Sequence, residues 1–286
     1  MNQWHPLEKG RALARRGKQL AVNPVIQAAT GLEAMGSHQA NDIFIVGYPK
    51  SGNTWFQNLV SGVVYGTNPQ FTPETLISEL VPDVHKKRFY KRFRTPMFYK
   101  SHAMPQETYK RVVYLLRDGR DAMVSYFHYL NGWREREVDF LEMVESGQGL
   151  MYKWHAHTEA WLANPYNADI LTIKYENLKR DTVHELERFV AFANIERNVV
   201  WLEQVAKDNE FKKMQAKEKA GDYFDASMDL ANKQFFRRGI VGSYKDEMPP
   251  EVLAAFLHDA QATLQRCGYA AEGVGKTAVS NMDQQG

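Results

Sequence analysis

Residues Ile45 to Trp55 read IVGYPKSGNTW and carry the clearest structural signal in the chain. An apolar run gives way to a turn rich in glycine, serine and lysine, and a helical pattern follows. A strand that ends in small residues just before a helix leaves backbone N–H groups unpaired, and the helix dipole favours an anion beside them. The stretch therefore predicts a phosphate-binding loop, to which Lys50 adds a positive charge.

This loop differs from the phosphate loop of nucleotide triphosphatases at one position. Gly47, Gly52 and Thr54 fit the pattern G-x-x-x-x-G-K-[ST], but Asn53 stands where that pattern has its lysine. The lysine of this chain, Lys50, lies three residues upstream. Because the usual lysine contacts the β- and γ-phosphates of the nucleotide, its displacement favours a different phosphate donor.

Length and composition are typical of one α/β domain. The chain has 286 residues, of which 44% are hydrophobic, and its formal net charge of +2 leaves room only for local basic patches. Cys267 is the single cysteine and cannot form an internal disulfide, which suits a reducing compartment. The start of the sequence lacks the apolar core of a secretory signal, and no stretch approaches the roughly 20 apolar residues of a membrane helix. We therefore expect a cytoplasmic protein with no membrane partner.

Short apolar runs alternate with helical patterns along the chain. Strands are expected at 43–47, 111–118 and 169–178 and at the end of 98–102, with helices over 54–65 and 183–193. This alternation predicts an α/β fold, in which a single domain has a central parallel sheet flanked by helices and a P-loop-like phosphate-binding loop. Ligands of such sheets gather at the carboxyl ends of the strands.

The expected domain covers residues 41–270. Residues 1–40 are predicted to be a helical or partly disordered lead-in, and residues 271–286 a flexible tail. The charged segment from Lys212 to Gln234, which has few periodic apolar residues, is predicted to be a lid over the ligand.

Two segments have the composition of anion receptors. Arg117 ends an apolar run and Ser125 follows eight residues later, so that a guanidinium and a hydroxyl group can face one phosphate. The segment FFRRGIVGSYK (235–245) places Arg237 and Arg238 directly before Gly239. Taken alone, the first arginine could equally be a surface ion-pair partner, and the second segment a basic surface turn.

Several motifs, taken together and in order, resemble the sulfotransferases that use 3′-phosphoadenosine 5′-phosphosulfate (PAPS). YPKSGNTW resembles their donor-binding loop, VVYLLRDGRDAMVSYFHY resembles their first 3′-phosphate segment, and FFRRGIVGSYK resembles the second. The resemblance runs from about residue 42 to residue 269. The chain departs from the family where Asp118, Gly119 and Arg120 replace Asn-Pro-Lys, and where Arg238 replaces a lysine.

The resemblance implies an enzyme that moves a sulfuryl group from PAPS to a hydroxyl or amine of a small-molecule acceptor and releases adenosine 3′,5′-bisphosphate. It implies no metal and no nucleic-acid partner. The dimer motif of the family is not found in its usual place, so a monomer and a homodimer both remain open. The sequence does not identify the acceptor.

The resemblance also assigns roles to residues. In FYKSHAMP, which is similar to the family's K-T-H-L-P, His102 is the expected general base and Lys100 lies beside the sulfuryl group, while Lys50 meets the leaving oxygen. His157, in WHAH, is a second candidate base. The expected donor contacts are Lys50, Ser51, Gly52, Asn53, Thr54, Trp55, Arg117, Ser125, Tyr175, Phe211, Arg237, Arg238 and Gly239. Among these, the aromatic residues are assigned to the adenine.

Other functions also fit parts of the sequence. A P-loop kinase-like phosphotransferase would share the loop, and a non-catalytic nucleotide- or RNA-binding protein would share the basic run HKKRFYKRFR (85–94). The displaced lysine argues against the first alternative. Lys100 and His102 argue against the second, since a binding module needs no base.

Overall fold

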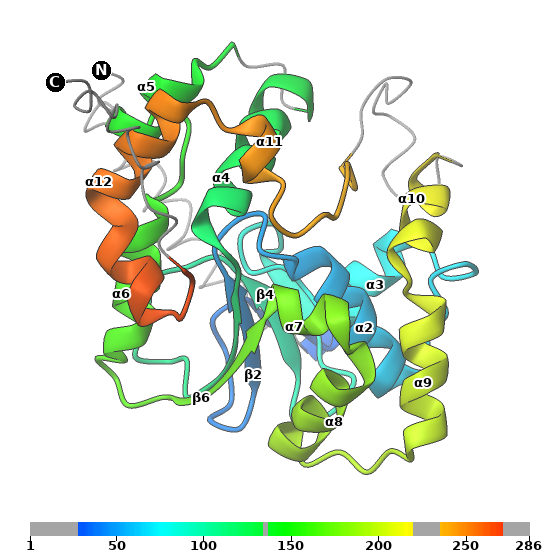
Figure 1. Cartoon of the computed structure of the whole chain (residues 1–286). Coiled ribbons are helices and arrows are strands. Elements are labelled where there is room, and N and C mark those ends of the chain that lie inside the picture. The colour runs from blue at the N-terminus through cyan, green and yellow to red at the C-terminus, as the bar shows by residue number, and fades with distance from the viewer. Residues whose placement is uncertain (1–27, 134–136, 220–234, 271–286) are drawn as a thin grey trace, which may run out of the picture.

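The computed structural model describes residues 28–133, 137–219 and 235–270, which are arranged around a parallel sheet (Figure 1). The strands lie in the order β4 (Phe98–Ser101), β2 (Ile43–Gly47), β5 (Arg111–Leu116) and β6 (Asp169–Lys174). Every neighbouring pair is parallel, and Ile43 lies opposite both Phe98 and Arg111. The predicted α/β fold with a central parallel sheet is therefore confirmed.

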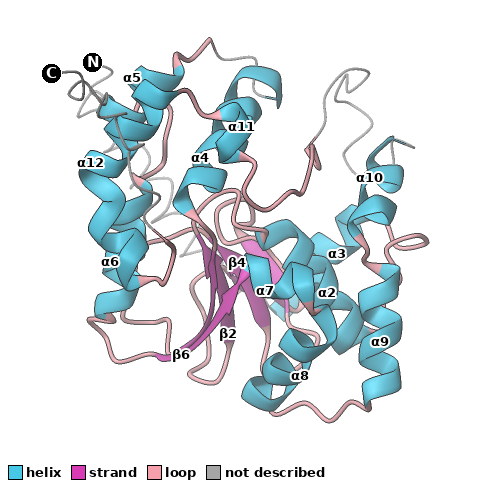
Figure 2. Cartoon of the chain, in the orientation of Figure 1, coloured by secondary structure: helices cyan, strands magenta, loops and turns pink. Residues whose placement is uncertain are grey.

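Helices cover both faces of this sheet (Figure 2). One face packs against α2 (Asn53–Tyr65), α8 (Thr182–Ala193) and α9 (Val199–Asp208), with α7 (Tyr175–Arg180) beside them. The other face packs against α4 (Gly119–His128), α5 (Phe140–Ser146), α6 (Trp154–Ala163) and α12 (Pro250–Arg266). Shorter elements complete the described chain, namely α3 (Glu74–Leu80), the π-helix η1 (Tyr129–Trp133), α10 (Phe211–Lys219) and α11 (Tyr244–Glu247).

The central strand β2 explains why the core divides into two. Its side chains alternate between the faces, so that Phe44 and Val46 join one apolar cluster while Ile43 and Ile45 join the other. All of these side chains are fully buried. A strand covered on both faces must be apolar throughout, which is the pattern that the sequence shows.

The structure differs from the sequence prediction in two places. Residues Leu32–Ala34 form β1, which pairs antiparallel with β3 (Phe89–Lys91), although no strand is predicted within residues 1–40. The strand predicted to reach residue 178 ends at Lys174, because Tyr175 begins α7. Residues 212–219 of the predicted lid belong to α10, and residues 220–234 lie outside the described part. Residues 1–27 of the lead-in and the predicted tail also lie outside it.

Across residues 28–133, 137–219 and 235–270, no helix combines the length and apolar character that crossing a bilayer requires.

Asp42 fastens the amino-terminal edge of the sheet. Its buried carboxylate accepts hydrogen bonds from Nη1 and Nη2 of Arg92, each at 2.9 Å, and from the backbone N–H groups of Met97 (2.9 Å) and Gln39 (2.8 Å). Burial by itself raises the pKa of Asp42, but the hydrogen bonds from Arg92 and the two amides lower it below its usual value. The carboxylate thus joins the start of β2 to the start of β4.

We expect Asp42→Ala to lower the free energy of unfolding by about 3 kcal/mol, because Nη1 and Nη2 of Arg92 and two backbone amides lose their acceptor and Arg92 keeps, among the described residues, only Glu33 as an acidic partner. Urea denaturation checks this. Asp169→Ala is the matched control, since that carboxylate is 66% exposed and lies 3.8 Å from Arg111, and its loss should cost under about 1 kcal/mol. Equal losses in the two variants would contradict the assigned role. Because the pKa of Asp42 is depressed, its contribution should also disappear as the pH falls through that pKa.

Candidate active site

The loops at the carboxyl ends of β2, β4 and β5 open onto one cleft of about 710 Å³. Lys50, Lys100, His102 and Arg117, which come from the ends of these three strands, all line it. The cleft is also lined by most of the other predicted donor residues, namely Gly52, Asn53, Thr54, Trp55, Ser125, Tyr175, Phe211, Arg237, Arg238 and Gly239. Ser51 is the exception, because its side chain is buried beneath the loop.

The phosphate-type loop has the backbone shape that its sequence suggests. Lys50 and Gly52 both have positive φ angles, of 71° and 96°, and a Cβ atom on Gly52 would lie 2.9 Å from the ring of Tyr175. The backbone N–H groups of Gly52, Asn53 and Thr54, at the start of α2, find no acceptor within the described chain. They therefore remain available to an anion in the cleft.

Asn53, which replaces the lysine of the nucleotide triphosphatase pattern, stabilises the loop through hydrogen bonds. Its Nδ2 donates to the carbonyl oxygens of Gly47 at 3.3 Å and Ser101 at 3.4 Å. These carbonyls end β2 and β4, so the side chain ties two neighbouring strands to the first turn of α2. A lysine at this position would point its charge at the ligand, whereas the asparagine fixes the scaffold.

Lys50 is held between two aromatic rings. Its Nζ lies 3.8 Å from the ring centroid of Phe235 and 4.7 Å from that of Tyr129, and its carbonyl oxygen accepts a hydrogen bond from Nη1 of Arg117 at 2.9 Å. Burial, followed by the nearby charge of Arg117, lowers the pKa of Lys50 to about 7. The charge of this lysine therefore responds to anything that enters the cleft near neutral pH.

Lys100 is buried at the end of β4. Its Nζ donates to Oγ1 of Thr54 at 3.2 Å and lies 3.5 Å from Oδ2 of Asp83. Burial lowers the pKa of Lys100, and the charge of Asp83 offsets part of that effect. The ammonium group is thus fixed next to the phosphate-type loop by a hydroxyl and a carboxylate.

His102 follows β4 and faces the same cleft. Its Nδ1 lies 2.8 Å from the carbonyl oxygen of Gly47, which can only accept a hydrogen bond, so Nδ1 carries the proton and Nε2 keeps its lone pair. Burial, followed by the charge of Lys100, lowers the pKa of His102 to about 3. The backbone N–H of His102 donates to Nε2 of His85 at 3.0 Å. The imidazole is therefore neutral and ready to accept a proton at Nε2.

Arg117 and Ser125 lie on the wall formed by β5 and α4. The guanidinium of Arg117 donates to the carbonyl oxygens of Lys50 and Ile240, at 2.9 and 3.4 Å, and its carbon Cζ lies 4.4 Å from the ring centroid of Tyr175. Its Nε is buried without a hydrogen-bond partner. Its Nη2 lies 3.9 Å from Oδ2 of Asp121, so the alternative of an ion-pair partner for Arg117 is also met in part.

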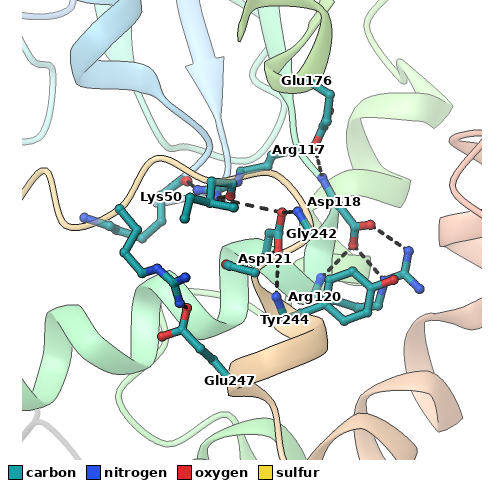
Figure 3. Close-up of polar contacts among 12 residues, drawn as sticks. Lys50, Arg117, Asp118, Arg120, Asp121, Glu176, Gly242, Tyr244 and Glu247 are labelled. Carbon is teal, nitrogen blue, oxygen red and sulfur yellow. Dashed lines mark hydrogen bonds and ion pairs between the residues drawn. The ribbon is translucent and has the colours of Figure 1, made fainter. Parts of the chain in front are cut away.

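Arg237 and Arg238 line this wall too, but both are paired with a carboxylate that no sequence motif indicates. Each forms an ion pair with Glu247, at the end of α11. Figure 3 shows Glu247 with the neighbouring polar contacts of Lys50, Arg117 and Asp121.

Three aromatic residues line the remaining wall. Nε1 of Trp55 donates to the carbonyl oxygen of Asn209 at 2.8 Å, and the Trp55 ring lies 5.9 Å from the ring of Tyr175. Phe211 packs on Gly239, where a Cβ atom would lie 2.5 Å from the ring. These rings offer flat apolar surface to a base, although Trp55 and Tyr175 are also buried core residues.

His157, the second candidate base, lies in the core. It is fully buried, its Nδ1 lies 3.3 Å from the hydroxyl of Tyr114, and it does not line the cleft. Burial lowers its pKa to about 4. The structure therefore gives no support to His157 as the second candidate base, because α6 turns this side chain into the core.

Acidic residues that no sequence motif indicated lie in the cleft, as Asp83 and Glu74 do, or pair with its arginines from outside the lining, as Glu247 does. Asp83 faces Lys100, Glu247 faces the two arginines, and Glu74, at the start of α3, has its pKa raised by burial to about 7. Their positions depend on contacts across the fold, so no local pattern could reveal them. Among the described residues, no three His, Cys, Asp or Glu side chains are grouped so as to hold a metal ion.

A parallel α/β sheet with a phosphate-type loop, two lysines and a neutral histidine on one cleft defines a nucleotide-dependent group-transfer enzyme. The sulfotransferase domain model matches residues 40–268 of this chain. The chain therefore belongs to the sulfotransferase family, as its motifs predicted, and a kinase or a non-catalytic binding protein is not favoured.

Relatives of known identity agree with this assignment. Rat sulfotransferase 1E1 is 22% identical over 81% of this chain and 86% of its own length, and zebrafish cytosolic sulfotransferase 1 is 27% identical over 72% and 77%. The fold is similar to mouse sulfotransferase SULT7A1 complexed with PAP, with a TM-score of 0.61, 22% identity and coverage of 82% of this chain and 92% of the other. It is also similar to retinol dehydratase in complex with androsterone and the inactive cofactor PAP, with a TM-score of 0.58, 19% identity and coverage of 79% and 81%.

Proposed function

We propose that this sulfotransferase moves the sulfuryl group of PAPS to a hydroxyl or amine of a small-molecule acceptor, with His102 as the general base and Lys50 and Lys100 as electrostatic stabilisers. One observation carries the proposal. A neutral imidazole with its lone pair at Nε2 lines the same cleft as two lysines and the unpaired amides of the loop.

The donor wall fits a nucleotide that carries two phosphate groups. The amides of Gly52, Asn53 and Thr54 offer donors at one position, and Arg117 and Ser125, which line the cleft, offer a guanidinium and a hydroxyl at another. Tyr175 and Phe211 supply apolar faces for the base. When bound, PAPS supplies an activated sulfuryl group whose bond to a phosphate oxygen is broken in the transfer.

His102 removes the proton from the attacking group of the acceptor. The carbonyl of Gly47 keeps Nδ1 protonated, so the incoming proton goes to Nε2, and the same carbonyl then stabilises the imidazolium through the Nδ1–H hydrogen bond. Nearby Asp83 also favours the charged form, while Lys100 opposes it. The imidazolium form of His102 is therefore stabilised mainly by the negative charge that develops beside it during the transfer.

The two lysines meet that developing negative charge. Lys50 lies on the loop, where the leaving phosphate oxygen is expected, and Lys100 is fixed by Thr54 and Asp83 next to it. Both ammonium groups have lowered pKa values because they are buried, and charge acts more strongly where water is excluded. This is stabilisation by positioned charge, with no covalent enzyme intermediate.

The acceptor half of the cleft has walls of two kinds. Tyr126, Leu130 and Met151 give one apolar side, while Ser78 and Glu79 of α3 give a polar side. That one structural relative is described in complex with androsterone supports a small-molecule acceptor here as well. The cytoplasmic location and the choice between monomer and homodimer stay predictions from the sequence.

We expect adenosine 3′,5′-bisphosphate to bind more tightly than adenosine 5′-monophosphate, because Arg117 and Ser125 face the 3′-phosphate. Arg117→Ala should remove most of this preference, by on the order of 2–4 kcal/mol. Isothermal titration calorimetry with both nucleotides measures it. The monophosphate is the internal control, since its affinity should fall much less. Equal affinities of the two nucleotides for the wild type would reject the 3′-phosphate assignment.

We expect His102→Ala to lower turnover by about 10²–10⁴-fold and to leave the affinity for the bisphosphate nearly unchanged, because the imidazole acts on the acceptor side. Lys50→Ala should lower both turnover and nucleotide affinity, because its charge meets the donor in the ground state and the leaving oxygen in the transition state. Single-turnover transfer of labelled sulfate and equilibrium binding separate the two effects. Near-wild-type turnover of His102→Ala would place the base elsewhere.

We expect binding of the bisphosphate to be coupled to proton uptake by Lys50. The pKa of Lys50 is about 7 in the free enzyme, and a bound anion raises it, so binding favours the protonated lysine. Affinity should be highest below pH 7 and fall as the pH rises, by up to about tenfold per unit. Calorimetry in Tris and HEPES, which differ in ionisation enthalpy, measures the uptake. Lys50→Arg is the control, because a guanidinium stays charged, and uptake that persists in this variant would contradict the assignment.

A further inference from the structure

Glu247 gathers three basic side chains around one carboxylate. Its Oε1 accepts from Nη2 of Arg237 at 2.9 Å and from Nη1 of Arg238 at 2.8 Å. Its Oε2 accepts from Nη1 of Arg237 at 2.5 Å and lies 3.1 Å from Nε2 of His128. Burial by itself raises the pKa of Glu247, but the hydrogen bond and charge of Arg237 outweigh this and lower it, so the carboxylate is charged.

The carboxylate belongs to a rigid frame. Glu247 ends α11, and the start of α11 is fastened to α4 by Asp121, which accepts from the backbone N–H of Gly242 at 2.7 Å and of Tyr244 at 3.0 Å (Figure 3). The Asp121 side chain is fully buried. His128, the other neighbour of Glu247, ends α4 itself. Glu247 is thus fixed relative to the helix that carries Ser125.

The two arginines come from a segment without regular structure. Residues 235–243 form neither helix nor strand. α10 contacts this segment through hydrogen bonds to its backbone and through the ring of Phe211, which packs against Phe236. Nε2 of Gln215 donates to the carbonyl oxygens of Phe236 and Arg237, at 2.7 and 2.9 Å, and the carboxylate of Glu218 accepts from the N–H of Phe236 at 2.9 Å. The ion pairs with Glu247 connect the two guanidinium groups to α11, which Asp121 joins to α4.

We propose that Glu247 is the positioning residue of the donor's 3′-phosphate subsite, an inference that rests on the proposed function. It holds Arg237 and Arg238 on the cleft wall that Arg117 and Ser125 also line, before any nucleotide arrives. Two permanent positive charges against one carboxylate leave the cluster attractive to an anion. Arg238 contacts Glu247 through Nη1 alone, so its Nη2 and Nε remain to bind phosphate. The ordering of both long side chains is then complete before binding, which lowers the entropic cost to the ligand.

The experiment compares adenosine 3′,5′-bisphosphate with adenosine 5′-monophosphate, which lacks the 3′-phosphate, on the full chain by calorimetry. Glu247→Gln should weaken bisphosphate binding about 10-fold, the order seen when a supporting partner of a ligating side chain is lost in metal sites, and leave the monophosphate within about twofold. Glu251→Gln, an exposed carboxylate in the first turn of α12, is the matched control and should change neither affinity. Glu247→Asp, which keeps the charge, should restore part of the loss.

A second comparison tests whether Glu247 acts through the arginines. In an Arg237→Ala, Arg238→Ala background, Glu247→Gln should add no further loss of bisphosphate affinity. Unchanged or tighter bisphosphate binding by Glu247→Gln would overturn the proposal, since it would mean that the carboxylate competes with the phosphate. Equal losses for both nucleotides would also overturn it, because they indicate a general structural role. A wild type that does not distinguish the nucleotides would reject the donor assignment itself, whereas a preference of undiminished size in Glu247→Gln rejects this inference alone.

Discussion

The carbonyl oxygen of Gly47 is the atom on which the rest of the active site depends. It ends β2, accepts from Nδ2 of Asn53 at 3.3 Å and lies 2.8 Å from Nδ1 of His102. A carbonyl has two lone pairs, and here one fixes the start of α2 while the other fixes the tautomer of the proposed base. The phosphate-type loop and the base are therefore positioned by one backbone group. Any movement of β2 relative to β4 would disturb donor binding and proton transfer together, which explains why both strands are buried and joined by Asn53 and Asp42.

Burial sets the electrostatic character of the cleft. The pKa values of Lys50, Lys100 and His102 are all lowered, with burial as the largest cause in each case. The same loss of hydration affects the base and the lysines in different ways. It keeps the histidine neutral, which a base requires, and it makes Lys50, whose pKa is lowered to about 7, depend on a bound anion for its full charge. Binding of an anionic donor therefore favours the protonated lysine. In the absence of the donor, the surface of the cleft is less strongly charged.

Local sequence predicted what local physics determines. The apolar strand, the turn at Lys50 to Gly52 and the following helix are encoded within a few residues, and the parallel order of the strands brings Lys100, His102 and Arg117 to one edge. The partners that tune these groups could not be predicted in the same way. Glu247 meets Arg237 because Asp121 fastens α11 to α4, and β1 pairs with β3 across more than fifty residues. The motif around His157 indicates a helix, but it does not indicate that this side of α6 turns toward Tyr114.

The cations of the cleft differ in what holds them. Lys100 lies beside Asp83, Arg117 lies 3.9 Å from Asp121, and the two arginines after Phe236 share Glu247. A carboxylate partner orders a long side chain and fixes its charge, at the cost of part of its attraction for an incoming phosphate. Within the described residues, Lys50 forms no ion pair and is held by the rings of Tyr129 and Phe235 instead. Aromatic faces orient an ammonium group without neutralising it, but they do not replace its hydration either. Lys50 is therefore the cation whose protonation can follow the ligand, and it lies on the loop where the leaving group is expected to gain its charge.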